Sequence, residues 1–169
     1  MINGETKQRG DITKHGIGVE VLLSIRKMQK SDVGLLFNIA LLAFKPDSEK
    51  YGMYPPLMRL NKKEFLPSQK FGKIILYDGE IIGGVFVMAF GKKGILGSIF
   101  LDPQQQGKGY GRQAMLMIEK MYPKVRRWKL DTPSESHGLH KFYKSLGYIK
   151  TGEMEDSGMK GFIFEKTIE

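Results

Sequence analysis

The segment with the clearest chemical signature runs from Leu101 to Arg112 and reads LDPQQQGKGYGR. Glycines at positions 107, 109 and 111 remove the Cβ atom at alternate residues, so the backbone can approach a ligand closely and adopt positive φ angles. An amphipathic helix is predicted directly after this turn. The free N–H groups at its start, together with the helix dipole, attract an anion. The segment therefore predicts a phosphate-binding loop.

Two common phosphate-binding motifs do not fit this segment. The P-loop requires Ser or Thr after Gly-Lys, but Lys108 is followed by Gly109, and Asp102 stands where the first glycine belongs. The dinucleotide-binding fingerprint requires glycine at position 112, which is arginine here. On spacing alone, the alternative is a flexible loop before a glycine-rich helix start.

The pattern Gln106-x-x-Gly109-x-Gly111 resembles the Gln/Arg-x-x-Gly-x-Gly/Ala signature of the GCN5-related N-acetyltransferases (GNAT family). A second patch, FYKSLGY at residues 142–148, is similar to the family's Phe-Tyr-x-x-x-Gly-Phe/Tyr segment on the following helix. The two patches come in the family's order with one predicted strand between them. The resemblance extends from Val21 to about Ile168.

This resemblance implies that acetyl-CoA, the acyl donor, binds in a cleft between two splayed strands, residues 95–102 and 125–131. Backbone groups of Ile99, Phe100 and Leu101 would pair with the pantetheine arm. Backbone amides of the glycine-rich turn would hold the pyrophosphate, namely those of Gln106, Gly107, Lys108, Gly109, Tyr110, Gly111 and Arg112. In the family the amine attacks the thioester directly, without an acyl-enzyme, which agrees with a chain that has no cysteine.

Tyr143 matches the family's tyrosine that protonates the departing thiolate. A phenol near the sulfur suits this task, because it donates a proton where negative charge develops. Tyr143 also shares a helical face with Leu139, Phe142 and Leu146, so packing in the core is the alternative role.

The general base has no clear counterpart. Many family members carry a glutamate on the strand before the signature, whereas the corresponding stretch here, GILGSIF, has no carboxylate. Asp131, at the end of the strand before the tyrosine helix, is the candidate base. The alternatives are a water chain, a substrate amine with a low pKa, or a purely solvated role for Asp131. Ser136 replaces the family's asparagine and is expected to cap the tyrosine helix.

Two other regions bear on the site. His137 and His140 are spaced i, i+3 and could share a helix face, but a pair of histidines alone rarely forms a metal site, so no metal site is predicted. Residues 45–70 are polar and contain proline, and we expect them to shape the acceptor pocket. They carry no motif that identifies the acceptor.

The elements that position these residues are predicted from hydrophobic periodicity and turn residues. Strands are expected at 19–26, 71–77, 80–90, 95–102, 125–131, 148–153 and 161–168. Helices are expected after Ser31-Asp32, around 62–66, at 109–122 and at 139–146. This order indicates an α+β, GNAT-like acyl-CoA N-acyltransferase fold, with a central mixed, mostly antiparallel sheet flanked by helices. Residues 1–17 read as a poorly ordered lead-in, and residues 18–169 as a single acetyltransferase domain.

Composition narrows the class of protein further. A chain of 169 residues, 41% hydrophobic and 27% charged, is typical of one globular domain. The absence of cysteine excludes disulfides, thiolate nucleophiles and iron–sulfur clusters, and suits a cytoplasmic protein. No stretch approaches the ~20 apolar residues of a membrane span. The net charge of +9 favours acidic partners, but the basic residues are dispersed.

The sequence therefore predicts an N-acetyltransferase that moves an acetyl group from acetyl-CoA to a primary amine in a ternary complex. The alternative is a non-catalytic acyl-CoA-binding or sensing module, which the missing strand carboxylate favours. A nucleic-acid-binding domain ranks last, because the chain lacks interleaved aromatic and basic repeats. The acceptor stays unidentified, no metal is expected, and a homodimer is left open.

Overall fold

The strands of the protein form one eight-stranded sheet in the order β1-β2-β3-β4-β5-β6-β8-β7. The computed structural model describes residues 6–10, 21–51, 61–156 and 158–169. Neighbouring strands are antiparallel except β5 and β6, which are parallel. The strands are β1 (Thr6–Gly10), β2 (Val21–Lys27), β3 (Gly72–Tyr77), β4 (Glu80–Phe90), β5 (Lys93–Leu101), β6 (Arg127–Pro133), β7 (Ile149–Asp156) and β8 (Met159–Thr167). The expected α+β class with a mixed, mostly antiparallel sheet is confirmed.

Strand β1 lies within the stretch that the sequence predicted to be poorly ordered. Thr6–Gly10 pairs with Val21–Ile25 of β2 in an antiparallel ladder, and this pairing supplies backbone hydrogen bonds that the prediction did not foresee. For these five residues the structure differs from the expected lead-in. The remainder of residues 1–17 lies outside the described residues.

The β3–β4 hairpin follows the expected turn chemistry. Asp78 and Gly79 adopt positive φ angles of 49° and 82°, which the two central residues of a tight hairpin turn require. The two strands are buried along most of their length, so this hairpin forms the middle of the sheet.

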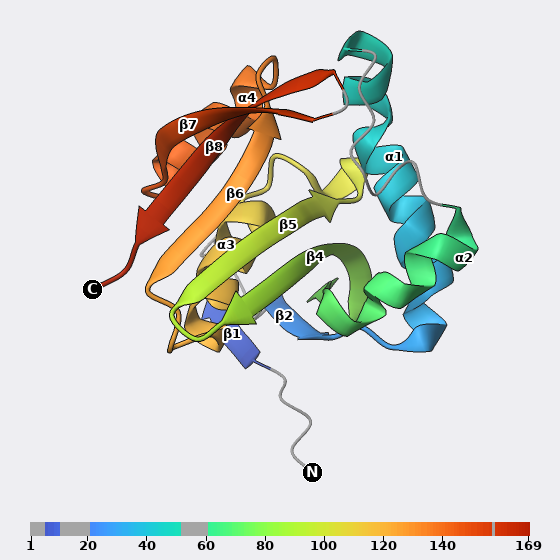
Figure 1. Ribbon diagram of the computed structural model, residues 1–169. Coiled ribbons are helices and arrows are strands. Elements are labelled where there is room, and N and C mark those ends of the chain that lie inside the picture. The colour runs from blue at the N-terminus through green and yellow to red at the C-terminus, as the bar shows by residue number, and fades with distance from the viewer. Residues whose placement is uncertain (1–5, 11–20, 52–60, 157) are drawn as a thin grey trace, which may run out of the picture.

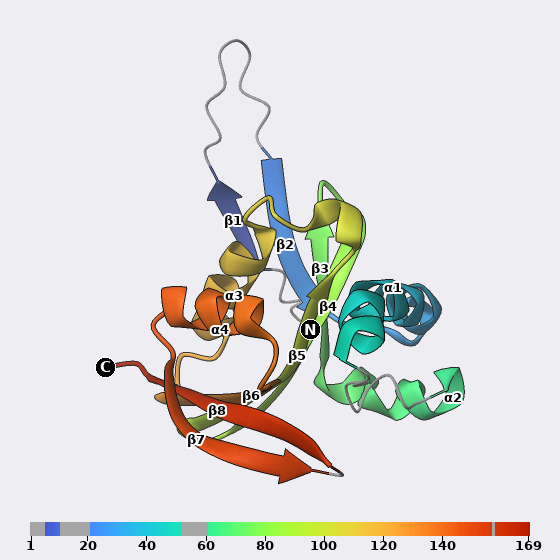
Figure 2. The ribbon, with the colours of Figure 1, turned by 90° about the horizontal axis from the view of Figure 1, so that it is seen from above.

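Helices cover both faces of the sheet (Figure 2). On one face lie α3 (Tyr110–Met121) and α4 (His137–Ser145), and on the other lie α1 (Val33–Tyr51) and the short α2 (Lys62–Phe65). Short 3₁₀ turns occur at Lys30–Asp32, Leu66–Phe71 and Pro103–Gln105. The buried side chains accordingly form two clusters, one under each pair of helices.

Helix α1 is longer than its sequence suggests, because it continues through Pro46 to Tyr51. Proline inside a helix removes one backbone donor and normally kinks or ends the helix, so the sequence favoured an end near Lys45. Residues before and after Pro46 stay in the helix, and Ser48 Oγ donates a hydrogen bond to the Phe44 carbonyl at 2.9 Å. This continuation carries the end of α1 toward the β7–β8 hairpin (Figure 1).

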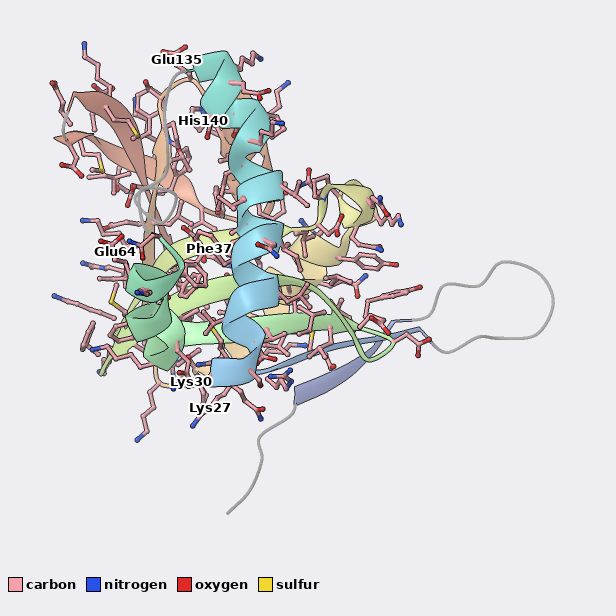
Figure 3. The ribbon with its side chains drawn as sticks, turned by 90° about the vertical axis from the view of Figure 1, so that its right-hand side faces the viewer. Lys27, Lys30, Phe37, Glu64, Glu135 and His140 are labelled. Atoms are coloured by element: carbon pink, nitrogen blue, oxygen red, sulfur yellow. The ribbon has the colours of Figure 1, made fainter. Side chains whose placement is uncertain are left out.

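Helix α1 is fixed to the sheet at its start and middle (Figure 3). Asp32 accepts two hydrogen bonds from the Arg26 guanidinium, at 2.7 and 2.9 Å, just before the helix begins. Further along, the Phe37 ring packs on Phe65 of α2 with 5.3 Å between ring centroids. The helix therefore has a defined position over β4 and β5.

Candidate active site

The site is created by a split in the sheet between β5 and β6. The two strands pair only over Lys93–Ile95 and Arg127–Lys129, after which they diverge (Figure 1). On its other edge β5 contains an irregularity, because Phe86 pairs with Ser98 and Val87 with Leu96, leaving Gly97 as an extra residue. A bulge of this kind bends its strand. It lies where β5 leaves β6.

A cavity of about 610 Å³ is lined by residues on both sides of this split. Its lining falls into two halves, which lie on the two faces of the sheet. One half consists of the β5 edge, the glycine-rich loop and α4, represented by Ile99, Gly109 and Phe142. The other half consists of the end of α1 and the β7–β8 hairpin, represented by Asp47 and Met154.

Two of the three glycines of the glycine-rich loop have the conformation that the sequence predicted, whereas Gly111 lies within α3 and has no positive φ angle. Gly107 and Gly109 have positive φ angles of 72° and 83°. No atom lies within 4 Å of a Cβ built at either position, so the space beside the backbone is open. Gly109 is the N-cap residue of α3, and the first N–H groups of a helix have no partner within the helix. Open space beside free N–H groups is what a phosphate requires.

Most of the predicted cofactor residues line the cavity: Ile99, Phe100, Leu101, Gln106, Gly107, Gly109, Gly111 and Arg112. Gln106 Nε2 also donates a hydrogen bond to the Leu101 carbonyl at 3.0 Å, which ties the loop to the end of β5. Arg112 Nη1 donates to the Ser145 carbonyl at 3.0 Å, so α3 is joined to α4 beside the loop.

Two of the predicted cofactor residues are not among those that line the cavity. Lys108 Nζ donates a hydrogen bond to Gln105 Oε1 at 3.1 Å. The Tyr110 side chain is buried and packs on Tyr77, with 4.7 Å between ring centroids. The sequence assigned the backbone amides of both residues to the pyrophosphate, and it also expected the charges of Lys108 and Arg112 at the rim of the anion site. These assignments stay predictions.

Tyr143 is brought into the cavity from α4. Its ring is 5% exposed and packs against Phe142, Tyr148 and Phe164, so the packing role is also present. Burial, with a contribution from the Asp131 charge, raises the pKa of Tyr143 well above its ordinary value. The phenol therefore keeps its proton at neutral pH and is available as a donor.

Asp131 reaches the same cavity from β6. Its side chain is solvent-exposed, yet the surrounding protein raises the pKa of this carboxyl, mainly by desolvation. The positive charge of Lys129 opposes this rise and the negative charge of Asp156 adds to it. A carboxylate with a raised pKa accepts a proton more readily, which suits a general base.

Sequence reasoning missed several residues of the site. Thr132 and Ser136 are among the lining residues, and their hydroxyls are buried and have no hydrogen-bond partner among the described residues. Ser136 occupies the N-cap position of α4, but its side chain makes no capping hydrogen bond, so the expected capping role is wrong. Asp47 and Asp156 also line the cavity, and no local motif marks either one.

The pair of histidines, His137 and His140, packs against neighbouring side chains and backbone. His140 is buried, and its Nε2 lies 3.0 Å from the Pro133 carbonyl oxygen, while its ring packs on Phe162 and Phe164. His137 stacks edge-on against it at 5.7 Å between ring centroids. No cluster of three potential metal ligands occurs in the part of the chain that the structure describes.

A sheet opened between two parallel strands, with a glycine-rich loop beside the opening, is the arrangement of an acyl-CoA-dependent acyltransferase. The sequence pattern of the acetyltransferase (GNAT) family matches residues 36–148, more than half of the chain. The protein therefore belongs to the GNAT family, as its signature residues indicated. No described helix is long and apolar enough to cross a membrane.

Individual relatives agree with this assignment. An uncharacterized N-acetyltransferase of Bacillus subtilis (strain 168), YfmK, is 35% identical over 57 residues, which is 32% of this chain and 38% of that protein. This match thus spans less than half of the relative's length.

Solved structures share the fold. The PaiA N-acetyltransferase from Thermoplasma acidophilum, in complex with coenzyme A, matches with a TM-score of 0.73 and 21% identity, over 86% of this chain and 99% of that one. The ribosomal-protein-S18-alanine N-acetyltransferase from Escherichia coli matches with a TM-score of 0.70 and 16% identity, over 86% and 94% of the two chains. At these identities the similarity concerns the fold alone.

Proposed function

We propose that this protein transfers the acetyl group of acetyl-CoA to a primary amine, which attacks the thioester directly while both substrates are bound. The observation that carries this proposal is the continuous cavity through the split between β5 and β6. This cavity brings the glycine-rich loop, Tyr143 and Asp131 to one space.

The residues on the α3–α4 side fit the acyl donor. Beyond Ile95, the edge of β5 that faces away from β4 has no strand partner among the described residues. Its backbone groups at Ile99 are therefore available to the amides of a pantetheine arm, whereas the Leu101 carbonyl already accepts a hydrogen bond from Gln106. The open space at Gly107 and Gly109 would receive the pyrophosphate. When bound, acetyl-CoA supplies an activated acetyl thioester.

Asp131 and Tyr143 divide the proton transfers between them. Asp131 accepts a proton from the substrate ammonium, which frees the nitrogen lone pair for attack on the thioester carbonyl carbon. As the carbon–sulfur bond breaks, Tyr143 donates its phenolic proton to the departing sulfur. The proton that the new amide nitrogen loses restores the phenol. Asp131 then releases the proton that it took from the substrate ammonium to solvent, and the enzyme returns to its starting state. General acid and base groups of this kind each contribute roughly 10²- to 10⁴-fold to a rate.

The test is a screen of primary amines with acetyl-CoA, in which free thiol release is followed together with mass analysis of the acetylated product. Stoichiometric thiol and N-acetyl product support the proposal. Calorimetric binding of acetyl-CoA with no thiol release by any amine would instead identify a non-catalytic acyl-CoA-binding module. This second candidate is favoured by β5, which carries no carboxylate between Lys93 and Leu101.

A further inference from the structure

The half of the cavity that faces α1 and the β7–β8 hairpin is rich in negative charge. Three carboxylates line the cavity, and they come from three separate elements: Asp47 from α1, Asp131 from β6 and Asp156 from β7. Arg112 is the basic residue among the described lining residues, and it belongs to the loop half, where it bonds Ser145. The negative charge of this half of the cavity contrasts with the net charge of +9 of the whole chain.

Two of these carboxylates act on each other within the cavity. The pKa of Asp131 is raised mainly by desolvation; the positive charge of Lys129 opposes the rise, and the negative charge of Asp156 adds a smaller contribution to it. Like charges gathered in one cavity destabilise the empty site, and a bound cation relieves that repulsion. The carboxylates thus favour a positively charged ligand.

A second, independent feature of the same cavity points to a ligand with hydrogen-bond donors. Thr132 Oγ1 and Ser136 Oγ are unpartnered among the described residues, and their side chains are 2% and 4% exposed. A buried hydroxyl without a partner is costly, so such groups commonly complete their hydrogen bonds with a ligand or water. An ammonium has three N–H donors and satisfies acceptors of this kind.

Apolar side chains lie among these polar groups. Phe44 on α1, and Met154 and Met159 on the β7–β8 hairpin, line the same half of the cavity. Methionine and phenylalanine offer flexible apolar surface that accommodates methylene chains. The lining therefore alternates carboxylates with surface suited to an aliphatic spacer.

We propose that the acceptor is an aliphatic diamine or polyamine, which carries at least one further ammonium beside the amine that reacts. The reacting amine gives its proton to Asp131, and the second ammonium lies against Asp47 and Asp156 with the alkyl chain on the methionines. This inference rests on the proposed acetyl transfer and names the substrate class of that site.

The experiment compares 1,4-diaminobutane with 1-aminobutane, because they differ only in the second ammonium. Thiol release gives kcat/KM for each, and the ratio of the two is the readout. We expect the diamine to be preferred roughly 10- to 100-fold, as one well-placed charge pair in a partly desolvated site provides. Raising the salt concentration should lower this preference, since exposed charge pairs are screened.

Single substitutions test whether Asp47 and Asp156 cause the preference for the diamine. Asp156→Asn and Asp47→Asn should each reduce the diamine-to-monoamine ratio severalfold. Glu155→Gln is the matched control, because it removes the same charge from the neighbouring residue, which is not among the cavity-lining residues. The control should keep the ratio of the unmodified protein.

The outcomes separate the two proposals. Equal kcat/KM for the two amines overturns the polyamine inference and leaves acetyl transfer intact, and this comparison needs no variant to fold. A clear preference for a lysine-containing basic peptide over the diamine also overturns the inference. Failure of every amine to release thiol overturns the proposed acetyl transfer and the inference with it.

Discussion

Replacing Tyr143 by phenylalanine tests the assignment of the proton donor with the least structural disturbance. The change removes one oxygen and keeps the ring, whose centroid lies 5.8 Å from that of Tyr148 and 6.4 Å from that of Phe164. The Tyr143 hydroxyl makes no hydrogen bond to any of the residues that the structure describes. The packing around α4 should therefore survive, and the melting temperature should change little.

The expected loss of activity follows from the position of the hydroxyl. General acid catalysis contributes roughly 10²- to 10⁴-fold to a rate. We therefore expect kcat to fall about 10²-fold, equivalent to ~2.7 kcal/mol of transition-state stabilisation. The affinity for acetyl-CoA should stay within about twofold, because backbone groups of β5 and the glycine-rich loop provide that binding.

The assay is thiol release at saturating acetyl-CoA and amine, with calorimetric titration of the donor and a thermal melt on the same preparation. Tyr148→Phe is the control, because this neighbouring tyrosine donates its hydroxyl to Glu119 Oε1 at 3.1 Å, away from the cavity. The control should lose about 1 kcal/mol of stability and keep its kcat. A Tyr143→Phe protein with full kcat would refute the assignment of Tyr143 as the acid.

Three further predictions follow from the same contacts. Gly109→Asp should weaken acetyl-CoA binding at least tenfold, because it places a negative charge beside the pyrophosphate. The control Gly79→Asp, at an equally open turn with a φ of 82°, should bind acetyl-CoA with unchanged affinity in the same titration. Asp131→Asn should lower kcat/KM, and in the unmodified protein kcat/KM should rise with pH through the raised pKa of this carboxyl, because the base must be ionised. Because the pKa of Asp131 is higher in the folded protein than its ordinary value of 3.8, this carboxyl contributes stability below pH 3.8, and the contribution is lost as the pH rises through the folded pKa. Asp131→Asn should therefore melt at a higher temperature than the unmodified protein at neutral pH. Glu119→Ala should lower the free energy of unfolding by about 2–3 kcal/mol, because the largely buried Lys166 ammonium loses its ion-pair partner at 2.7 Å. Urea denaturation measures this loss, and an unchanged midpoint would contradict the prediction.

Local chemistry made part of this site predictable. The positive φ angles of Gly107 and Gly109 could be predicted from residue type, because only residues without a Cβ adopt positive φ freely. The Asp78-Gly79 turn is equally local, and it places β3 and β4 correctly. Tyr143 was proposed from the resemblance of the FYKSLGY segment to the family's motif, and Asp131 from its position at the end of a predicted strand.

Other features depend on contacts that no short stretch of sequence encodes. Asp47 and Asp156 are more than a hundred residues apart in the sequence and line the same cavity, and Asp47 belongs to α1 because this helix continues through Pro46. Helix-breaking propensity predicted an earlier end, and tertiary packing overrode it. The capping role expected of Ser136 failed, because its side chain makes no hydrogen bond to the N–H groups at the start of α4.

The early end of pairing between β5 and β6 has a consequence for the stability of the whole fold. Beyond Ile95, β5 no longer pairs with β6, so backbone amides and carbonyls on this edge of β5 are exposed to water in the interior of the sheet. Most proteins avoid exposed strand edges of this kind. Any molecule that lays two or three amide groups along this edge becomes, in effect, a missing ninth strand. The free energy of its binding is then also free energy of folding, and the protein reaches its most rigid state only when loaded.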